Sequence, residues 1–462
     1  MPEINASLKD SNRDKFGQIP EDLLKFIQRD TYSLLVKGYA GTGKTTLALT
    51  ILNVLGVRNN FFYISTRLSP KQLFQYYPWL SDLVRQSKTQ SGDFLRDREA
   101  ISTFEDARLD EPESLFERIT NQLMDIKSPI IIIDSWDAIA SFMDREARLN
   151  NERVLQTWRE RAGAKLIFIS EQPTDTTLDF LVDGIVELKQ SHYCNAKVRQ
   201  VDIQKLRGTC ITHSSYLYTL DGGIFHSFSP YRRISFQPSR GNDGQAYHVS
   251  RHDKVQTGFP LLDISLGGGY PLKGLVLLEL DSRVNMTIAL VFLQRIILNF
   301  ILSGNPVLLQ YGNWLSLSSI LNMFSAPLPS DKKKLLNMLC IRKKQTPEGL
   351  LASLRRTRQK YRNKTLLNIM SAEAIQSLTT PGDPIRLTPD TLSRAISQSD
   401  LSIAVLPPSC KGLLQTILEG SDIYLRLTMI ADTLFLQPLI PSSILHALIF
   451  DGQSNTILKP LV

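Results

Sequence analysis

The sequence predicts an α/β protein with two similar domains, each built on a mainly parallel central sheet. Two observations support this fold class. From Asp30 to Phe228 short β-rich runs alternate with helical segments, and after a polar stretch the same alternation begins again. The chain of 462 residues is also too long for one ordinary core, because a domain holds roughly 100 to 200 residues.

The apolar runs of the first half predict a parallel sheet. Six runs have the length and composition of strands: Tyr32 to Val36, Phe61 to Ile64, Ile130 to Ile133, Lys165 to Ser170, Asp183 to Leu188 and Val201 to Leu206. The four consecutive isoleucines do not alternate with polar residues, which is typical of a central strand buried on both faces. We therefore assign residues 1–228 to the first domain and interpret the polar, Gly/Pro/Ser/Arg-containing stretch 229–254 as a linker.

The second half, residues 255–462, repeats this pattern with different chemistry. Its strands are predicted at Val276 to Leu280, Pro306 to Gln310 and Ile403 to Leu406. When Leu34 is aligned with Val276 without gaps, Met286 falls opposite Lys44 and Asn285 opposite Gly43. The repeated pattern indicates a tandem duplication. The second copy is degenerate, because methionine carries no charge that could bind a phosphate. The alternative is a chance similarity between two unrelated α/β domains.

Composition excludes several classes of protein. The four cysteines, Cys194, Cys210, Cys340 and Cys410, lie far apart and form no C-x-x-C pair, so neither a zinc site nor a disulfide framework is expected. The N-terminal residues are polar, and no stretch reaches the ~18 apolar residues that span a bilayer. We expect a soluble, cytoplasmic protein with no membrane partner.

One motif carries most of the functional information. Between a predicted strand and a predicted helix the chain matches the phosphate-binding loop (P-loop, or Walker A) pattern G-x-x-x-x-G-K-[ST]. Glycine allows backbone N–H groups to surround phosphates, the lysine adds a cation, and the Thr45 hydroxyl can bind Mg²⁺. The expected ATP-binding residues are Gly38, Tyr39, Ala40, Gly41, Thr42, Gly43, Lys44, Thr45 and Thr46.

A second motif supplies a carboxylate. Asp134 follows the isoleucine run and fits a Walker B element, in which a buried strand delivers an acid at its C-terminal end. We expect Asp134 and Thr45 to hold Mg²⁺, because Mg²⁺ bound to ATP needs few protein ligands. The alternative is that Asp134 only caps the following turn.

These motifs together resemble those of RecA-superfamily ATPases of the KaiC type. The resemblance rests on the P-loop, on Ile130 to Ile139, on Lys205 to Gly208, and on Thr257 to Asp263 with Gly267 to Gly269. Within that group, Tyr63 to Pro70 and Asp106 to Ser114 are most similar to the archaeal gas-vesicle regulators of the GvpD type. The resemblance implies two tandem RecA-like domains of P-loop NTPase fold.

The resemblance also reveals a departure. KaiC-like proteins carry a pair of glutamates at the end of the second strand, and one of them activates water, whereas this chain has Thr66-Arg67-Leu68 there. General-base catalysis needs an acceptor within reach of the water, and Glu171 and Asp137 are the candidates by location. We therefore expect slow hydrolysis, or a protein that mainly senses ATP.

Lys205 and Arg207 resemble the K-x-R pair that reaches the γ-phosphate of the next subunit in ring-forming relatives. Alternate residues of one strand share a face, so both side chains can point at one phosphate. The resemblance implies a catalytic role for both residues and a homo-oligomer. The alternative is an exposed basic strand face.

Two functions follow, and a third remains open. The leading hypothesis is a regulatory ATPase of KaiC/GvpD type that controls a protein partner. The alternative is a DNA-binding, recombinase-accessory-like ATPase, because residues 332–364 hold twelve Lys or Arg and one acid, Glu348. A third possibility is a scaffold in which ATP is purely structural. The sequence does not identify the partner, the pathway or the number of subunits.

Overall fold

The computed structural model resolves into two compact units, residues 1–229 with 461–462 and residues 230–460. The structure describes residues 18–57, 60–81, 102–108, 112–123, 128–172, 174, 177–193, 196–231, 253–312, 318, 320, 323–324, 328–341, 347–379, 389–450 and 456–462. Most of the expected linker (232–252), Cys194 and Arg342 to Lys344 lie outside these residues. We call the two parts unit 1 and unit 2.

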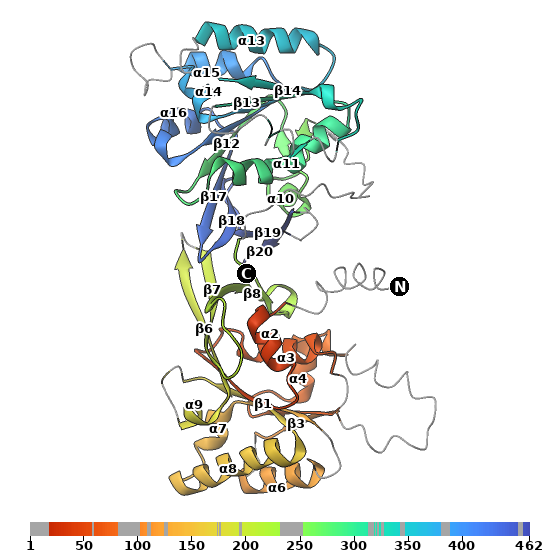
Figure 1. Ribbon diagram of the computed structural model, residues 1–462, viewed down its shortest axis with the longest axis vertical. Coiled ribbons are helices and arrows are strands. Elements are labelled where there is room, and N and C mark those ends of the chain that lie inside the picture. Colours follow the sequence, from red (N-terminus) through yellow and green to blue (C-terminus); the bar gives the residue numbers. More distant parts are fainter. Residues whose placement is uncertain are drawn as a thin grey trace, which may run out of the picture. The chain divides into compact units, whose positions relative to one another are not determined.

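Unit 1 is built on a nine-stranded sheet of order β3-β2-β4-β5-β1-β6-β7-β8-β9 (Figure 1). The six strands from β3 to β6 are parallel, and β7 to β9 extend the sheet antiparallel. The strands are β1 (Tyr32–Gly38), β2 (Phe61–Ser65), β3 (Ser102–Asp106), β4 (Ile130–Asp134), β5 (Lys165–Ser170), β6 (Gly184–Tyr193), β7 (Ala196–Leu206), β8 (Ser215–Thr219) and β9 (His226–Ser227).

Helices cover both faces of this sheet. They are α2 (Glu21–Ile27), α3 (Lys44–Val54), α4 (Pro70–Tyr76), α6 (Pro112–Leu123), α7 (Trp136–Ala140), α8 (Arg145–Ala162) and α9 (Thr177–Leu181), with a 3-10 turn η1 (Asp221–Gly223). The isoleucines of β4 explain why both faces are covered. Ile130 and Ile132 join the core beneath α2 and α3, whereas Ile131 and Ile133 join the core beneath α6, α7 and α8.

Unit 2 repeats this architecture with a nine-stranded sheet of order β14-β13-β15-β16-β12-β17-β18-β19-β20. Its strands are β12 (Gly274–Leu280), β13 (Val307–Tyr311), β14 (Leu336–Cys340), β15 (Leu367–Met370), β16 (Leu401–Leu406), β17 (Ile423–Ile430), β18 (Thr433–Ile440), β19 (His446–Phe450) and β20 (Thr456–Pro460), beside a small ladder of β10 (Lys254–Val255) and β11 (Tyr270–Pro271). Its helices are α10 (Pro260–Ser265), α11 (Met286–Leu302), α13 (Pro347–Lys360), α14 (Ala372–Gln376), α15 (Pro389–Ile396) and α16 (Leu414–Glu419), with 3-10 turns η2 (Lys333–Leu335) and η3 (Pro408–Leu413).

The two sheets match strand for strand when β1 is placed on β12. Helix α3 then begins at Lys44 and α11 at Met286, which are the two residues that the ungapped alignment places opposite each other. Both sheets also have a register irregularity at the corresponding point, between Ile185 and Val186 in β6 and between Tyr424 and Leu425 in β17. The shared strand order and bulge favour duplication over chance similarity.

The predicted tandem α/β fold is therefore confirmed, with one correction to the first sheet. Val201 to Leu206 belongs to β7, which runs antiparallel to β6 rather than extending the parallel part. The sequence reasoning also missed β3, β8 and β9. Within the described residues, no helix combines the length and the apolar character that crossing a membrane requires.

Candidate functional site

The P-loop connects the C-terminal end of β1 to the first turn of α3. Gly38, Gly41 and Gly43 have positive φ angles of 149°, 78° and 92°, a region that side chains rarely adopt. A Cβ atom on Gly43 would lie 2.6 Å from Cδ1 of Leu220, so the space above this glycine is filled. The backbone thus turns tightly, and the N-terminal amides of α3 are oriented so that they can bind an anion.

Lys44, the first residue of α3, is buried beneath the loop. Its Nζ donates hydrogen bonds to the carbonyl oxygens of Gly38 at 2.7 Å and Tyr39 at 2.9 Å. Burial lowers the pKa of Lys44, and the nearby Glu171 and Asp134 carboxylates oppose that shift. The ammonium group is therefore held at the phosphate-binding loop and surrounded by acidic side chains.

Asp134 and Thr45 meet at the carboxyl edge of the sheet. The Thr45 hydroxyl donates to Oδ2 of Asp134 at 2.6 Å, and the Tyr63 hydroxyl donates to the same oxygen at 2.5 Å. Burial and the Asp134 charge raise the pKa of Tyr63, which keeps its hydroxyl protonated as a donor. Sequence reasoning paired Thr45 with Asp134 but missed Tyr63, whose place in β2 looked purely structural.

The two candidate bases are in contact: Glu171 lies just beyond β5, and Asp137 lies in α7, which follows β4. The Asp137 carboxylate accepts from the Glu171 backbone N–H at 2.6 Å and from the Ser170 hydroxyl at 3.2 Å. Both oxygens of the Asp137 carboxylate thus accept hydrogen bonds from Ser170 and Glu171. The Glu171 side chain forms an ion pair with Arg67, which follows β2 by two residues.

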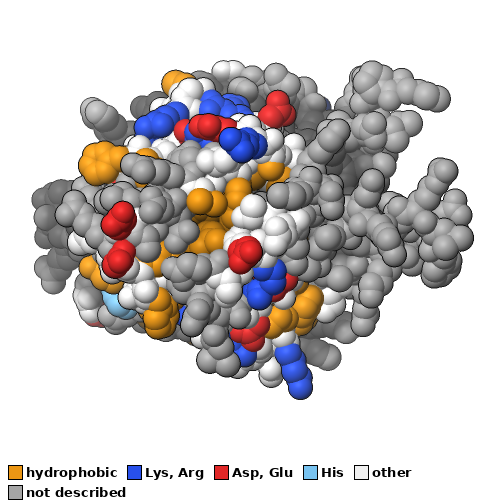
Figure 2. Space-filling view, turned by 90° about the horizontal axis from the view of Figure 1, so that it is seen from below, with side chains coloured by type: hydrophobic (Ala, Val, Ile, Leu, Met, Phe, Trp, Pro, Cys, Tyr) orange, Lys and Arg blue, Asp and Glu red, His pale blue; other side chains and the backbone are white. Residues whose placement is uncertain are grey.

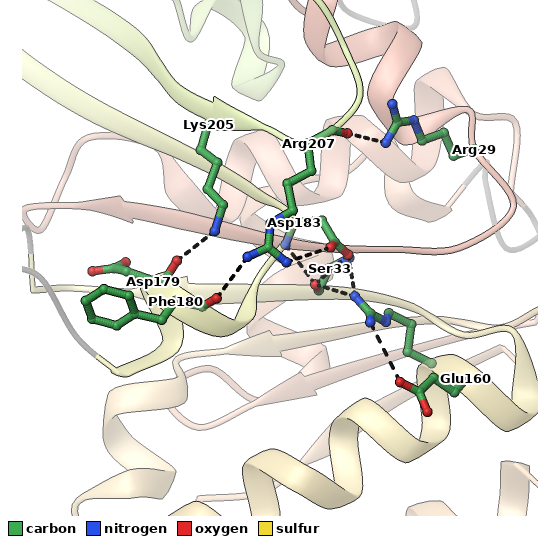
Figure 3. A network of polar contacts seen from close by, with 9 residues as sticks. Arg29, Ser33, Glu160, Asp179, Phe180, Asp183, Lys205 and Arg207 are labelled. Carbon is green, nitrogen blue, oxygen red and sulfur yellow. Dashed lines mark hydrogen bonds and ion pairs between the residues drawn. The ribbon is translucent and has the colours of Figure 1, made fainter.

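Lys205 and Arg207, at the end of β7, point together at the backbone around α9 (Figure 3). Lys205 Nζ donates to the Asp179 carbonyl oxygen at 2.9 Å, and Arg207 Nη2 donates to the Phe180 carbonyl oxygen at 3.2 Å. Arg207 also pairs with Asp183 at 3.6 Å while its side chain stays 55% exposed. The two cations share one face, as their spacing predicts.

This basic pair is remote from the P-loop of its own sheet. In the strand register Lys205 lies opposite Ile185, which pairs with Leu35 of β1. Leu35 is three residues before Gly38, a distance of about 10 Å along a strand. The structure does not bring Lys205 and Arg207 together with Lys44.

A buried ion pair connects the P-loop strand to α9. Lys37, which directly precedes Gly38, bonds Asp179 Oδ2 at 2.9 Å, and the side chains are 1% and 9% exposed. The carbonyl oxygen of the same Asp179 accepts from Lys205. Sequence reasoning missed this pair, because a lysine inside an apolar strand gave no indication of its distant partner.

The residues present fit Mg²⁺ and ATP. The loop has glycine at its positive-φ positions, and a hydroxyl and a carboxylate already lie 2.6 Å apart beside the lysine. No group of three His, Cys, Asp or Glu able to hold a metal occurs among the described residues. Mg²⁺ bound to ATP needs few protein ligands, and Thr45 and Asp134 are the residues that would hold it here.

Unit 2 lacks most of this chemistry at the matching positions, although Thr287 keeps the hydroxyl of Thr45. Met286 replaces Lys44, and strand pairing puts Ser371 at the place of Asp134 and Ile440 at the place of Lys205. The Asn285 side chain accepts from the Ile288 N–H at 3.0 Å, so it occupies one of the N-terminal amides of α11. The N-terminus of α3 has no side-chain cap, whereas the Asn285 side chain caps the N-terminus of α11.

The basic segment of unit 2 is only partly free. Arg355, Arg356 and Lys360 on α13 are exposed. Arg358, in contrast, bonds Asp400 at 2.6 Å, and Lys364 bonds the Gly304 carbonyl oxygen at 2.8 Å. Arg358 therefore has a structural role, and a test of polyanion binding should leave it intact.

Comparison with known proteins agrees with these features. A family model described as "GvpD gas vesicle protein, P-loop domain" matches residues 24–204. The chain is 27% identical over 278 residues to "Protein GvpD1" of Halobacterium salinarum (58% of this chain, 51% of that protein) and 24% identical over 304 residues to "Protein GvpD2" of the same organism (63% and 60%). It is also 25% identical over 255 residues to "Circadian clock oscillator protein KaiC" of Thermostichus vulcanus (51% and 45%).

The chain thus spans about half the length of the curated relatives it matches. The resemblance to RecA-superfamily ATPases of the KaiC type and to GvpD is confirmed, and so is a nucleotide-binding P-loop fold. The match to the family model includes Lys44, Asp134 and Glu171, and it ends one residue before Lys205.

Proposed function

We propose that this protein is an ATP-binding regulatory ATPase in which residues 1–228 bind Mg²⁺ and ATP and residues 255–462 form a degenerate partner domain. The observation that carries the proposal is the convergence of Lys44, Thr45 and Asp134 at one loop, with Thr45 and Asp134 joined at 2.6 Å. Similarity to GvpD and KaiC supports the regulatory role. Nucleotide state then controls a protein partner.

Each residue of the site has a distinct task in this function. The loop from Gly38 to Thr46 directs backbone N–H groups at the phosphates, and Lys44 exchanges its two loop carbonyls for phosphate oxygens. Thr45 and Asp134 hold the metal, with Tyr63 orienting the Asp134 carboxylate. Mg²⁺, when bound, neutralises charge on the β- and γ-phosphate oxygens.

Hydrolysis in this scheme is slow, because the nearest candidate base is engaged. Glu171 is paired with Arg67, and Asp137 holds the Glu171 backbone. Proton transfer needs a free acceptor within hydrogen-bond reach of the water. A slow ATPase is suited to a switch whose state is set by bound nucleotide.

Assembly completes the site in the proposed mechanism. Lys205 lies about 10 Å along the strand from its own loop, and Arg207 lies two residues farther away. Arg207 is exposed, and Phe180 beside it is 77% exposed. A head-to-tail contact between two copies would place this basic edge at the acidic P-loop edge of the next copy. The homo-oligomer thereby shares its active sites.

A protein partner is also part of the proposal. Large apolar side chains are exposed in unit 1, including Phe142 at 80%, and Figure 2 shows apolar side chains in several places on one face, among charged ones. Exposed apolar side chains of this size can contact a protein partner. The chemistry of the ATP site leaves the identity of the partner open.

The deciding experiment measures Mg²⁺-ATP binding and turnover on the purified chain across protein concentration. We expect micromolar or tighter binding and a low turnover that rises with concentration as copies assemble. Binding without any turnover would assign the protein to pure ATP sensing. Absence of ATP binding, in a chain whose circular dichroism shows a folded α/β protein, would refute the proposal.

DNA binding is a second candidate function, favoured by the exposed cations of α13. Replacement of Arg355 and Arg356 by Gln removes two charges from the exposed face and keeps the Arg358–Asp400 pair. If DNA is the ligand, binding weakens and the slope of log affinity against log salt falls by about 2. A wild-type chain that shows no salt-dependent DNA binding would exclude this candidate.

A further inference from the structure

Arg67 lies at the carboxyl edge of unit 1, and the proposed function gives it only the role of pairing with Glu171. It follows β2, and its neighbour Thr66 fastens this end of the strand to β4. Thr66 Oγ1 donates to the Asp134 carbonyl oxygen at 3.2 Å and accepts from the Ser135 N–H at 2.9 Å. Arg67 thus extends from a fixed backbone position next to the Walker B carboxylate.

The side chain of Arg67 reaches across the end of one strand. The strand order is β2-β4-β5, so the ion pair with Glu171 beyond β5 passes over the end of β4. The Arg67 side chain is 56% exposed and that of Glu171 is 28% exposed. An ion pair this exposed contributes little stability, typically 0–1 kcal/mol, so a structural role alone does not account for it.

Both partners lie close to the phosphate site. Glu171 directly follows Ser170, which pairs with Lys37 in the register of β1 and β5, one residue before the P-loop glycine Gly38. Lys44 donates to the carbonyl oxygen of that same Gly38 at 2.7 Å. A guanidinium paired with Glu171 at this edge of the sheet can exchange a carboxylate for a phosphate oxygen.

We propose that Arg67 is the γ-phosphate sensor of this protein and that Glu171 is its resting partner. With ADP bound, Arg67 stays paired with Glu171. With ATP bound, the planar guanidinium binds two oxygens of the γ-phosphate, which carries more negative charge than a carboxylate. The same movement releases Glu171, so the pairing that holds back hydrolysis in the proposed function belongs to the resting state. This inference rests on the proposed ATP function and adds the residue that distinguishes ATP from ADP.

The sensor has a thermodynamic signature that does not depend on turnover. Glu171 competes with the γ-phosphate for Arg67, so the two single variants have opposite effects. Arg67→Ala weakens ATP binding roughly 10-fold, the effect of losing one charge-assisted hydrogen bond, and leaves ADP binding unchanged within about twofold. Glu171→Gln strengthens ATP binding several-fold, again with little change for ADP.

The double variant separates this exchange from a simple effect of local charge. If Glu171 acts on ATP only by competing for Arg67, then Arg67→Ala with Glu171→Gln behaves like Arg67→Ala alone. If both residues act only through their charges, their effects cancel and the double variant resembles the wild type. The second result would overturn the proposal.

The experiment is a titration of the full chain and its three variants with Mg²⁺-ATP, Mg²⁺-ADP and a non-hydrolysable ATP analogue. Arg67→Lys is the matched control, and we expect it to recover part of the ATP preference because it keeps the charge without the bidentate geometry. Unchanged ATP-to-ADP ratios in all variants refute the sensor while leaving the ATP function intact. If the wild type binds neither nucleotide, the ATP function itself fails, and the sensor with it.

Discussion

Unit 1 and unit 2 share one topology but differ at the edge where their parallel strands end. In unit 1 a glycine opens the first turn of α3, and Lys44 lies beneath it, whereas in unit 2 an asparagine closes the first turn of α11 beside Met286. The strand order and the sheet bulge are the same. The difference shows that the fold depends on the core and that nucleotide chemistry depends on a few edge residues.

The cores explain this separation. Each sheet is packed on both faces by its own apolar clusters, one beneath the helix that follows the first strand and one beneath the helices of the other face. Edge residues contribute little to these clusters, so their replacement spares the fold. Unit 2 therefore retained its architecture when its loop lost the P-loop residues.

The largest expected contrast concerns the basic pair of β7 and its counterpart in β18. Arg207→Ala should lower turnover about 10³-fold or more, as loss of an arginine supplied by a neighbouring subunit does, with ATP affinity little changed. Ser442→Ala, the matched change in unit 2, should have no effect on turnover. The measurement is steady-state ATP hydrolysis at high protein concentration.

Mixing sharpens this prediction. Lys44→Ala lacks a working loop, and Arg207→Ala lacks the basic residue. When the two variants are mixed, some subunit contacts join the intact P-loop of an Arg207→Ala copy to the intact Arg207 of a Lys44→Ala copy. Part of the turnover should therefore return. A mixture no more active than its components would place Arg207 outside the neighbouring site.

The next contrast compares Lys37 with Glu279, which the alignment places at the same point of β1 and β12. Lys37→Met should destabilise unit 1 by about 3–5 kcal/mol, because it leaves Asp179 buried without its cation. Glu279→Gln should cost only about 1 kcal/mol, because its partner Arg426 is 30% exposed. Urea unfolding followed by tryptophan fluorescence follows both units, because Trp79, Trp136 and Trp158 lie in unit 1 and Trp314 lies in unit 2.

A compensated variant tests the cause of that loss. Replacing both members of the pair, Lys37→Met with Asp179→Leu, removes the unpaired charge and should recover most of the stability. If the double variant is as unstable as Lys37→Met, the loss comes from packing and the contribution of the ion pair is small.

A smaller contrast concerns the first residues of the two helices. Lys44→Ala should weaken ATP binding by about 1.5–3 kcal/mol, roughly 10- to 100-fold, because it removes one charged contact to the phosphates. Met286→Ala should leave ATP affinity unchanged. Calorimetric titration measures both, and an equal loss in the two variants would mean that unit 2 also binds nucleotide.

The smallest expected contrast concerns the N-cap residue of α11, Asn285. Asn285→Ala should destabilise α11 by about 1 kcal/mol, since its side chain accepts from the Ile288 N–H. Asn285→Gly should cost only a few tenths of a kcal/mol. Hydrogen-exchange protection of the α11 amides can distinguish the Asn285→Ala variant from the Asn285→Gly variant. Protection that is unaffected by Asn285→Ala would argue against the cap.

Much of the fold could be predicted from the sequence, because buried parallel strands read as uninterrupted apolar runs. Ile130 to Ile133 and Lys165 to Ser170 were located nearly to the residue. The antiparallel extension was harder to predict. In β6 the residues beyond Leu188 are mostly exposed and polar, so the hydrophobic pattern ends before the strand does.

What the sequence by itself determined is the chemistry of residues that are close along the chain. The P-loop is one continuous segment whose glycines, lysine and threonine are placed by a strand and a helix on either side, and the ungapped alignment with Met286 identified the degenerate copy. Local backbone geometry is sufficient for both conclusions.

Only the tertiary structure decided which distant charges meet. Arg67 pairs with Glu171, Lys37 with Asp179, and Arg358 with Asp400, and each pair joins segments separated by tens of residues or more. The order of strands in the sheet places these segments side by side, and that order is set by packing of the whole core. A charge in a sequence therefore identifies a possible donor or acceptor, whereas its partner is selected by the fold.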